Sequence, residues 1–338
     1  MLEDPGLDPL ELAGALRVAY GIDASALSFV PGYDLQAASY EVTTPDGSYF
    51  LKVRFDAVQE AALDVPRALL EAGVPNILAP IPTRSSALWA GMDGRSVVLQ
   101  PFLRGRNAMV AGLTDDQWHT FGATLRAVHD SGLERSFADR LPVETFALAA
   151  AVPVRRILEA ASRQTFESPT ARQLAAFCRQ QAGRISATLE RAEELGARLR
   201  VRSFDLVLCH ADIHAANILV TDEGGIVLVD WDGPMIAPRE RDLLFVIGSR
   251  IARLVEPHEE ARFFEGYGGV EVDPEAVVYY RYERILEDIW VDAASVFGDD
   301  SQSEATRQAQ VDQIVSFFVP GGDLETAEQR GAGLGSVS

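Results

Sequence analysis

The hydrophobic pattern of this chain changes once, near residue 103, and that change constrains the fold more than any other feature. Before it, short runs rich in Val, Phe, Tyr and Leu are typical of strands. After residue 114, apolar residues recur almost throughout at helical spacing. The 338 residues also exceed the roughly 250–300 at which a single core stops growing. We therefore predict an α+β protein with lobes at residues 1–102 and 103–338.

The first lobe reads as a small antiparallel sheet. A helix over 9–20 precedes it, and a second helix over 58–72, with Pro66 inside it, is inserted between the third and fourth strands. Turn residues at 45–47 and at 93–94 indicate two hairpins. The five predicted strands cover residues 26–30, 38–43, 48–55, 87–92 and 96–102.

The second lobe reads as mainly helical. One exception lies at residues 204–231, where two apolar runs flank the turn at 222–225 and indicate another hairpin. The glycine-rich stretch 320–338 is expected to be a flexible tail. The predicted helices cover residues 115–131, 170–195, 238–253, 257–267, 274–297 and 303–318.

Charge restricts the partners. Thirty basic against 50 acidic side chains give a net charge of −20, which repels nucleic-acid backbones and anionic membranes and favours cationic small molecules. No run approaches 18 apolar residues and the N-terminus has no signal-peptide pattern, so we expect a cytoplasmic protein. Cys178 and Cys209, set among apolar residues, are expected to be small core side chains rather than a disulfide framework. The sequence leaves the oligomeric state open.

The segment from Leu208 to Asp232 holds the densest set of reactive side chains, and it has two readings. In one, His210, Asp212 and His214 alternate along an extended chain and ligate zinc or iron, as in a metallohydrolase. Such a site needs further His or Cys ligands, of which the chain has few.

The second reading is phosphoryl transfer. Asp212 and Asn217 lie five positions apart, and Asp230 lies at the end of the following hairpin strand. Protein-kinase-type enzymes use this order: one Asp takes up the hydroxyl proton, and an Asn and a second Asp hold Mg²⁺ on the phosphates of ATP. Hard Mg²⁺ prefers such oxygen ligands. We therefore predict Asp212 as catalytic base, with Asn217 and Asp230 as metal ligands.

The same residues carry a family resemblance. The stretch His210-Ala211-Asp212, with Asn217 after four more residues, and the stretch 229–232 resemble the signature pair of the aminoglycoside phosphotransferase family. The resemblance runs from about residue 30 to about residue 297, and stretches at 209–214, 230–235, 238–243 and 279–285 are most similar to its spectinomycin-phosphorylating members. It implies a two-lobe protein-kinase-like fold, ATP and Mg²⁺, and transfer to a hydroxyl of an aminocyclitol antibiotic, conferring resistance.

Lys52 is the only lysine among 30 basic residues. It lies on the predicted third strand, where kinases place a lysine that grips the α- and β-phosphates. Arginine is forked and planar and does not replace a compact ammonium in a tight slot. We therefore predict that Lys52 binds the phosphates and pairs with Glu60 of the next helix.

The other expected contacts follow the kinase layout. Adenine is expected to bind the backbone of Gln100, Pro101 and Phe102, with Val53 and Leu219 as apolar neighbours. In the resembled family, acidic residues of late helices receive the ammonium groups of the antibiotic, which implies substrate-binding roles for this set: Asp232, Glu283, Glu287 and Asp288.

Two departures from the family pattern stand out. Many members of the family have Gly at the position of Ala211. The replacement costs little free energy only if the backbone dihedral angles there suit alanine. The loop expected over the phosphates, residues 31–38, has only Gly32 and no G-x-G-x-x-G. Two further hypotheses remain: a kinase of a metabolic alcohol such as choline, homoserine or methylthioribose, and a non-catalytic nucleotide-binding regulator.

Overall fold

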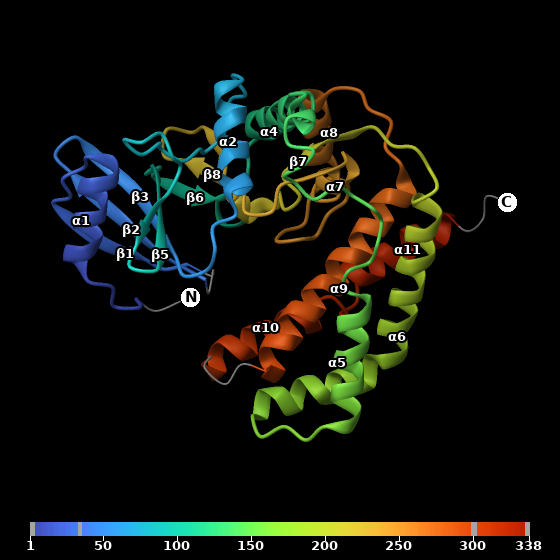
Figure 1. Ribbon diagram of the computed structural model, residues 1–338. Coiled ribbons are helices and arrows are strands. Elements are labelled where there is room, and N and C mark those ends of the chain that lie inside the picture. Colours follow the sequence, from blue (N-terminus) through green and yellow to red (C-terminus); the bar gives the residue numbers. More distant parts are fainter. Residues whose placement is uncertain (1–3, 33–35, 299–302, 335–338) are drawn as a thin grey trace. The chain divides into compact units, whose positions relative to one another are not determined.

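The computed structural model describes residues 4–32, 36–298 and 303–334 (Figure 1). The chain forms two compact units. The first comprises Met1–Pro142, Val207–Ile236 and His258–Gly269, and the second comprises Val143–Leu206, Ala237–Pro257 and Val270–Ser338. This grouping places the 207–236 segment with the N-terminal sheet. The lobe boundary after residue 102 stays a prediction.

The first unit contains the predicted five-stranded antiparallel sheet, with strand order β1-β2-β3-β5-β4. The last-but-one predicted strand is shorter than the expected 87–92, because Thr83 N donates to Ala87 O over 2.7 Å and closes a turn there. The strands are β1 (Ala26–Val30), β2 (Ala37–Thr44), β3 (Gly47–Arg54), β4 (Ala90–Met92) and β5 (Arg95–Pro101).

The two faces of this sheet differ. Helix α1 (Pro9–Tyr20) starts at the Asp8 cap, ends at Gly21 in the left-handed region (φ 72°), and buries Leu12 and Leu16 against one face. Alternate β3 residues such as Leu51 belong to that core. The residues between them point to the other face, towards the cavity described below, which α2 (Glu60–Glu71) also lines.

The rest of the first unit carries the segment that the sequence predicts to be catalytic. A second sheet has the order β6-β8-β9, all antiparallel, and confirms the predicted hairpin. Helices α4 and α8 cross closely, since a β-carbon at Gly122 or Gly266 would collide with the other helix's backbone. These elements are β6 (Gly105–Asn107), α3 (Ala108–Ala111), α4 (Asp115–His129), η1 (Leu133–Arg135), β7 (Leu206–Cys209), η2 (Ala215–Asn217), β8 (Ile218–Thr221), β9 (Ile226–Leu228), β10 (Met235–Pro238) and α8 (Pro257–Tyr267).

The second unit is helical. The long helices α6 and α9 lie side by side (Figure 1). Helix α5 was not predicted, although its buried Val154, Ile157 and Ala161 have helical spacing. The helices are α5 (Ala151–Arg163), α6 (Pro169–Leu199), α7 (Glu240–Leu243), α9 (Pro274–Gly298), α10 (Glu304–Ser316) and α11 (Asp323–Leu334).

Two predictions for this unit are wrong. The helix expected over 238–253 covers only Glu240–Leu243, because the chain then turns over residues 244–248, and Gly248 and Ala252 have positive φ outside the helical region. The flexible tail is wrong for residues 323–334, which form α11. Leu324 and Ala327 are fully buried there, and Glu328 pairs with Arg184 of α6 at 2.7 Å. Residues 335–338 lie outside the described residues.

Within the described ranges, no helix is both long enough and apolar enough to cross a membrane.

Candidate active site

A cavity of about 430 Å³ opens on the face of the five-stranded sheet opposite α1. Its size suits a nucleotide-sized ligand. The basic side chains on its wall are Lys52 and Arg54, and the acidic ones are Asp230 and Asp232. Every lining residue belongs to the first unit: Val30, Ser39, Phe50, Lys52, Arg54, Ala62, Leu63, Pro66, Leu78, Pro80, Val98, Gln100, Pro101, Phe102, Leu103, Gly105, Leu219, Val229, Asp230, Trp231 and Asp232.

Lys52 lies in this cavity, as the strand pattern predicts. Its ammonium nitrogen donates to Asp232 Oδ2 over 2.9 Å. Glu60, the predicted partner, is the exposed first residue of α2, and its pairing with Lys52 stays a prediction. The ion-pair partner Asp232 comes from the segment after β9.

Arg54 is a second cation on the same face, which the sequence reasoning missed. It donates to both carboxylate oxygens of Asp56 over 3.0 Å and to Asp232 Oδ2 over 3.0 Å. Desolvation raises the pKa of Asp232, but the charges and hydrogen bonds of Lys52 and Arg54 outweigh it and hold that pKa below its usual range. Alternate residues of a strand point to the same face, so the two-residue spacing from Lys52 would have predicted Arg54 on the cavity side.

Asp212 lies on the loop after β7, partly exposed. Asn217 Nδ2 donates to the Asp212 backbone carbonyl over 2.8 Å and lies 3.5 Å from Asp212 Oδ2, while His214 Nε2 lies 3.5 Å from the same oxygen. These contacts connect Asp212, the predicted base, to two other residues of the same loop. Ala211 beside it has φ 69°, in the left-handed region that alanine adopts only at a cost in free energy. Alanine in place of the family's glycine therefore strains the backbone here.

His210 braces this loop. It is fully buried, its Nε2 donates to the Val229 carbonyl over 3.0 Å, and its ring packs at 4.4 Å from that of Trp231. His214 Nδ1 instead accepts from the Ala216 amide over 3.2 Å. The two imidazoles serve separate backbone groups, which does not support the metallohydrolase reading.

Asn217 and Asp230 approach each other across the hairpin. Ile218 faces Leu228 in the β8–β9 register, and the Val229 amide donates to the Asn217 carbonyl over 3.0 Å. Asp230 then turns out of the strand with φ 64°. Partial desolvation, opposed by Lys52, raises the pKa of its carboxyl. With its nitrogen bound to Asp212, the Asn217 amide offers its oxygen, so this pair fits the oxygen ligands that Mg²⁺ prefers.

The expected adenine contacts belong to the same cavity. Gln100, Pro101, Phe102 and Leu219 all line it. Val53 does not, since it is fully buried in the core under α1. In the expected phosphate-covering loop, residues 33–35 lie outside the described residues.

The remaining predicted substrate residues lie on α9 in the second unit. Glu283 accepts hydrogen bonds from Arg241 and from the Tyr279 hydroxyl, and burial raises its pKa to about 7. Asp288 pairs with Arg284 at 3.0 Å. Glu287, on the same helix, is partly buried. Two of these three acids therefore already hold an arginine.

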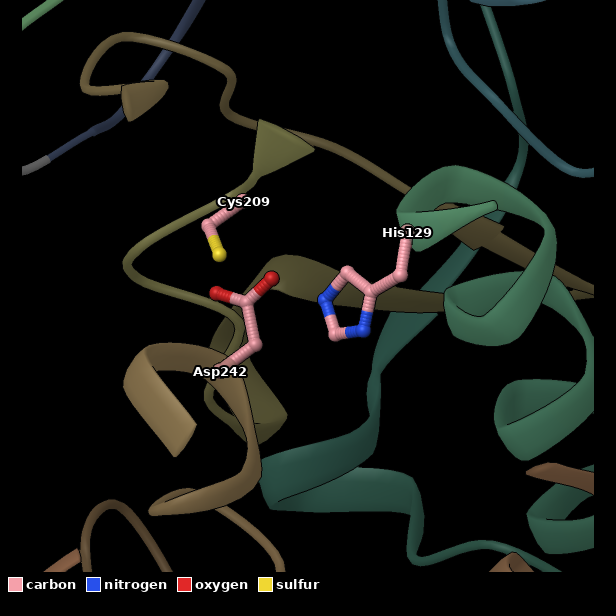
Figure 2. Close-up of side chains that lie close together, drawn as sticks. All are labelled: His129, Cys209 and Asp242. Carbon is pink, nitrogen blue, oxygen red and sulfur yellow. The ribbon is translucent and has the colours of Figure 1, made fainter. Parts of the chain in front are cut away.

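Both cysteines are buried, as predicted. Burial raises the pKa of Cys178 to about 11. Cys209 ends β7, just before the loop that contains Asp212, and is drawn in Figure 2 together with His129 of the same unit and Asp242 of the second.

Comparison with known proteins gives a consistent result. Residues 31–279 match the phosphotransferase enzyme family. A crystal structure of the spectinomycin phosphotransferase APH(9)-Ia with ADP and spectinomycin is similar over 96% of this chain and 99% of that one, with 30% identity and a TM-score of 0.87. The choline kinase LicA from Streptococcus pneumoniae, at 14% identity and a TM-score of 0.56 over 93% and 98% of the two chains, shares the fold.

A curated relative is protein StrN from Streptomyces griseus, 28% identical over 202 residues, or 58% of this chain. The chain spans 63% of the length of that relative.

Proposed function

The chain belongs to the phosphotransferase enzyme family, and we propose that it transfers the γ-phosphoryl group of ATP to a hydroxyl of a cationic aminocyclitol, spectinomycin in particular. The observation that carries this proposal is the clustering, in one unit, of a nucleotide-sized cavity containing Lys52 with the Asp212, Asn217 and Asp230 segment. The acceptor is supported by similarity over nearly the whole chain to a structure that contains ADP and spectinomycin.

Each residue has a defined task in this proposal. Asp212 orients the acceptor hydroxyl and takes its proton as the new P–O bond forms and the bond to ADP breaks. Asn217 and Asp230 hold Mg²⁺, which neutralises charge on the phosphates. Lys52 grips the α- and β-phosphates. The Gln100, Pro101 and Phe102 segment with Leu219 binds adenine.

Cationic groups of the acceptor need anionic partners. Glu283, Glu287 and Asp288 are the proposed ones. Because Glu283 and Asp288 already pair with arginines, an ammonium group would compete with or add to those contacts. Since ATP is the phosphoryl donor, we place the reaction in the cytoplasm.

Mass analysis tests the proposal directly. The protein is incubated with ATP, Mg²⁺ and one acceptor at a time from a panel of spectinomycin, choline, homoserine and methylthioribose, and ADP release is followed in parallel. We expect one added phosphoryl group on spectinomycin alone. Modification of a metabolic alcohol instead would replace the acceptor. Nucleotide binding with no turnover on any acceptor would favour the regulator.

A further inference from the structure

We propose that Arg54 is a positioning residue of the nucleotide cavity: held by Asp56, it fixes the Asp232 carboxylate against the Lys52 ammonium. This inference rests on the proposed function and deepens it. It makes Asp232 an anchor of the phosphate-binding lysine rather than a ligand of the acceptor.

The strand geometry places both cations together. On β3, Leu51 and Val53 are fully buried under α1, so Lys52 and Arg54 both point to the cavity side. Their side chains are 20% and 13% exposed. The two positive charges repel each other at this proximity, and a carboxylate shared between them offsets that repulsion.

Asp56 determines how Arg54 is oriented. Arg54 Nε and Nη2 donate to the two oxygens of Asp56, each over 3.0 Å, which fixes the plane of the guanidinium. The same contact lowers the pKa of Asp56 and keeps its carboxylate charged. Nη1 is then aimed at Asp232 Oδ2. A lysine at position 54 has no such fork and could not hold both carboxylates in this way.

Asp232 Oδ2 is the shared atom. It accepts from Lys52 Nζ over 2.9 Å and from Arg54 Nη1 over 3.0 Å. The Asp232 side chain is 44% exposed, so a single flexible lysine would fix it poorly. With Arg54 as a second donor, the carboxylate has one position, and the lysine that pairs with it is oriented before nucleotide arrives.

Nucleotide binding by the full-length protein provides the test. Dissociation constants for ADP with Mg²⁺ are measured by calorimetry for wild type, Arg54→Met, Asp232→Asn and the double variant. We expect each single variant to weaken binding about tenfold, on the scale of one lost charge-assisted contact. Because Arg54 acts through Asp232, the double variant should bind ADP at most about twofold more weakly than either single variant.

Two results would overturn the inference. One is ADP binding by Arg54→Met within twofold of wild type. The other is a double variant whose losses multiply, which would mean that Arg54 contacts the phosphates itself. Should Arg54→Met fail to fold, Arg54→Lys gives the same comparison, because it keeps the charge but cannot hold both carboxylates.

Matched variants separate this inference from the proposed function. Arg67→Met breaks another arginine–carboxylate pair of the same unit, with Glu71 at 2.7 Å and away from the cavity, and should bind ADP like wild type. Lys52→Met should bind ADP more weakly than any of them. If Lys52→Met binds normally, the phosphate-binding role of Lys52 fails, while phosphoryl transfer to spectinomycin in the mass analysis decides the proposed function separately. If Lys52→Met is weak and Arg54→Met is normal, only the inference fails.

Discussion

Ala211, immediately before the proposed base, and Asp230, a proposed metal ligand, both adopt left-handed backbone conformations, with φ of 69° and 64°. Aspartate tolerates this region better than alanine, whose β-carbon crowds the following carbonyl. At Ala211 the strain lies immediately before the proposed base. It has to be held there by the rest of the structure, and the buried His210 contact with Val229 is one such restraint.

Relief of this strain is measurable. We expect Ala211→Gly to raise the free energy of unfolding by about 1 kcal/mol, because the gain from a relaxed left-handed residue exceeds the greater entropy of glycine in the unfolded chain. Ala123→Gly on the exposed side of α4 is the matched control and should lower it by about 1 kcal/mol. Urea unfolding of both variants decides the matter. A loss of stability at position 211 would contradict the strain.

The proposed base makes the sharpest kinetic prediction. Asp212→Ala should lower kcat by about 10²–10⁴, the usual effect of losing a positioned acid–base group, while ADP binding stays near wild type. Asp222→Ala, an exposed aspartate in the β8–β9 turn, serves as the control and should leave kcat unchanged. Steady-state assays with the accepted antibiotic measure both. Turnover of Asp212→Ala within threefold of wild type would remove the assignment.

Local spacing predicted some parts of the site and not others. Asp212, Asn217 and Asp230 lie within one short segment, and their order alone led to the roles predicted for them, which stay predictions. The Lys52–Asp232 pair joins residues 180 positions apart, and no local pattern reports such a contact. The pairing of Lys52 with Glu60, chosen because Glu60 begins the next helix, stays a prediction.

Elements with a clear period were predicted well. The strands of the first sheet other than β4, and helices α1, α4, α8, α9 and α10, begin and end close to the expected residues. Predictions failed where consecutive residues are all buried, so that no helical period shows, and where a glycine-rich composition suggested a flexible segment. Leu244, Phe245 and Val246 are all apolar and buried, so they fit a helix as well as turns, and the glycines near the C-terminus obscured the buried face of α11.

Helix α9 carries an ionisable group that should make stability depend on pH. Desolvation and the nearby Asp288 raise the pKa of Asp292 to about 7, above the ordinary value of 3.8. Because the folded-state pKa is the higher one, the stabilisation is fully present below pH 3.8 and is lost as the pH rises through about 7. At pH 8 the ionised carboxylate therefore destabilises the folded chain.

Asp292→Asn should accordingly stabilise the protein at pH 8 and give little gain at pH 4. We expect about 1 kcal/mol at pH 8, after allowing for solvent screening of a partly exposed group. The exposed Asp312→Asn on α10 should show no such pH dependence. Thermal unfolding at the two pH values measures both variants. An Asp292→Asn effect that is equal at pH 4 and pH 8 would rule out the raised pKa.

At the scale of the whole molecule, the net charge of −20 acts on every ligand that approaches. It opposes the binding of an anionic nucleotide, and the two cations on β3 offset part of that repulsion within the cavity. It favours a cationic acceptor by long-range attraction. Such attraction falls with salt, because the Debye length shrinks from about 10 Å at 0.1 M to about 3 Å at 1 M ionic strength.

The acceptor's KM should therefore rise with salt. Between about 0.1 and 1 M sodium chloride, with ATP and Mg²⁺ saturating, we expect KM for spectinomycin to rise at least about threefold while kcat changes little, since screening weakens capture and not the chemistry inside the site. Potassium chloride at the same ionic strength should act equally, which separates screening from a specific ion effect. A KM independent of salt would mean that short-range contacts alone select the cation, with the acidic surface contributing nothing to capture.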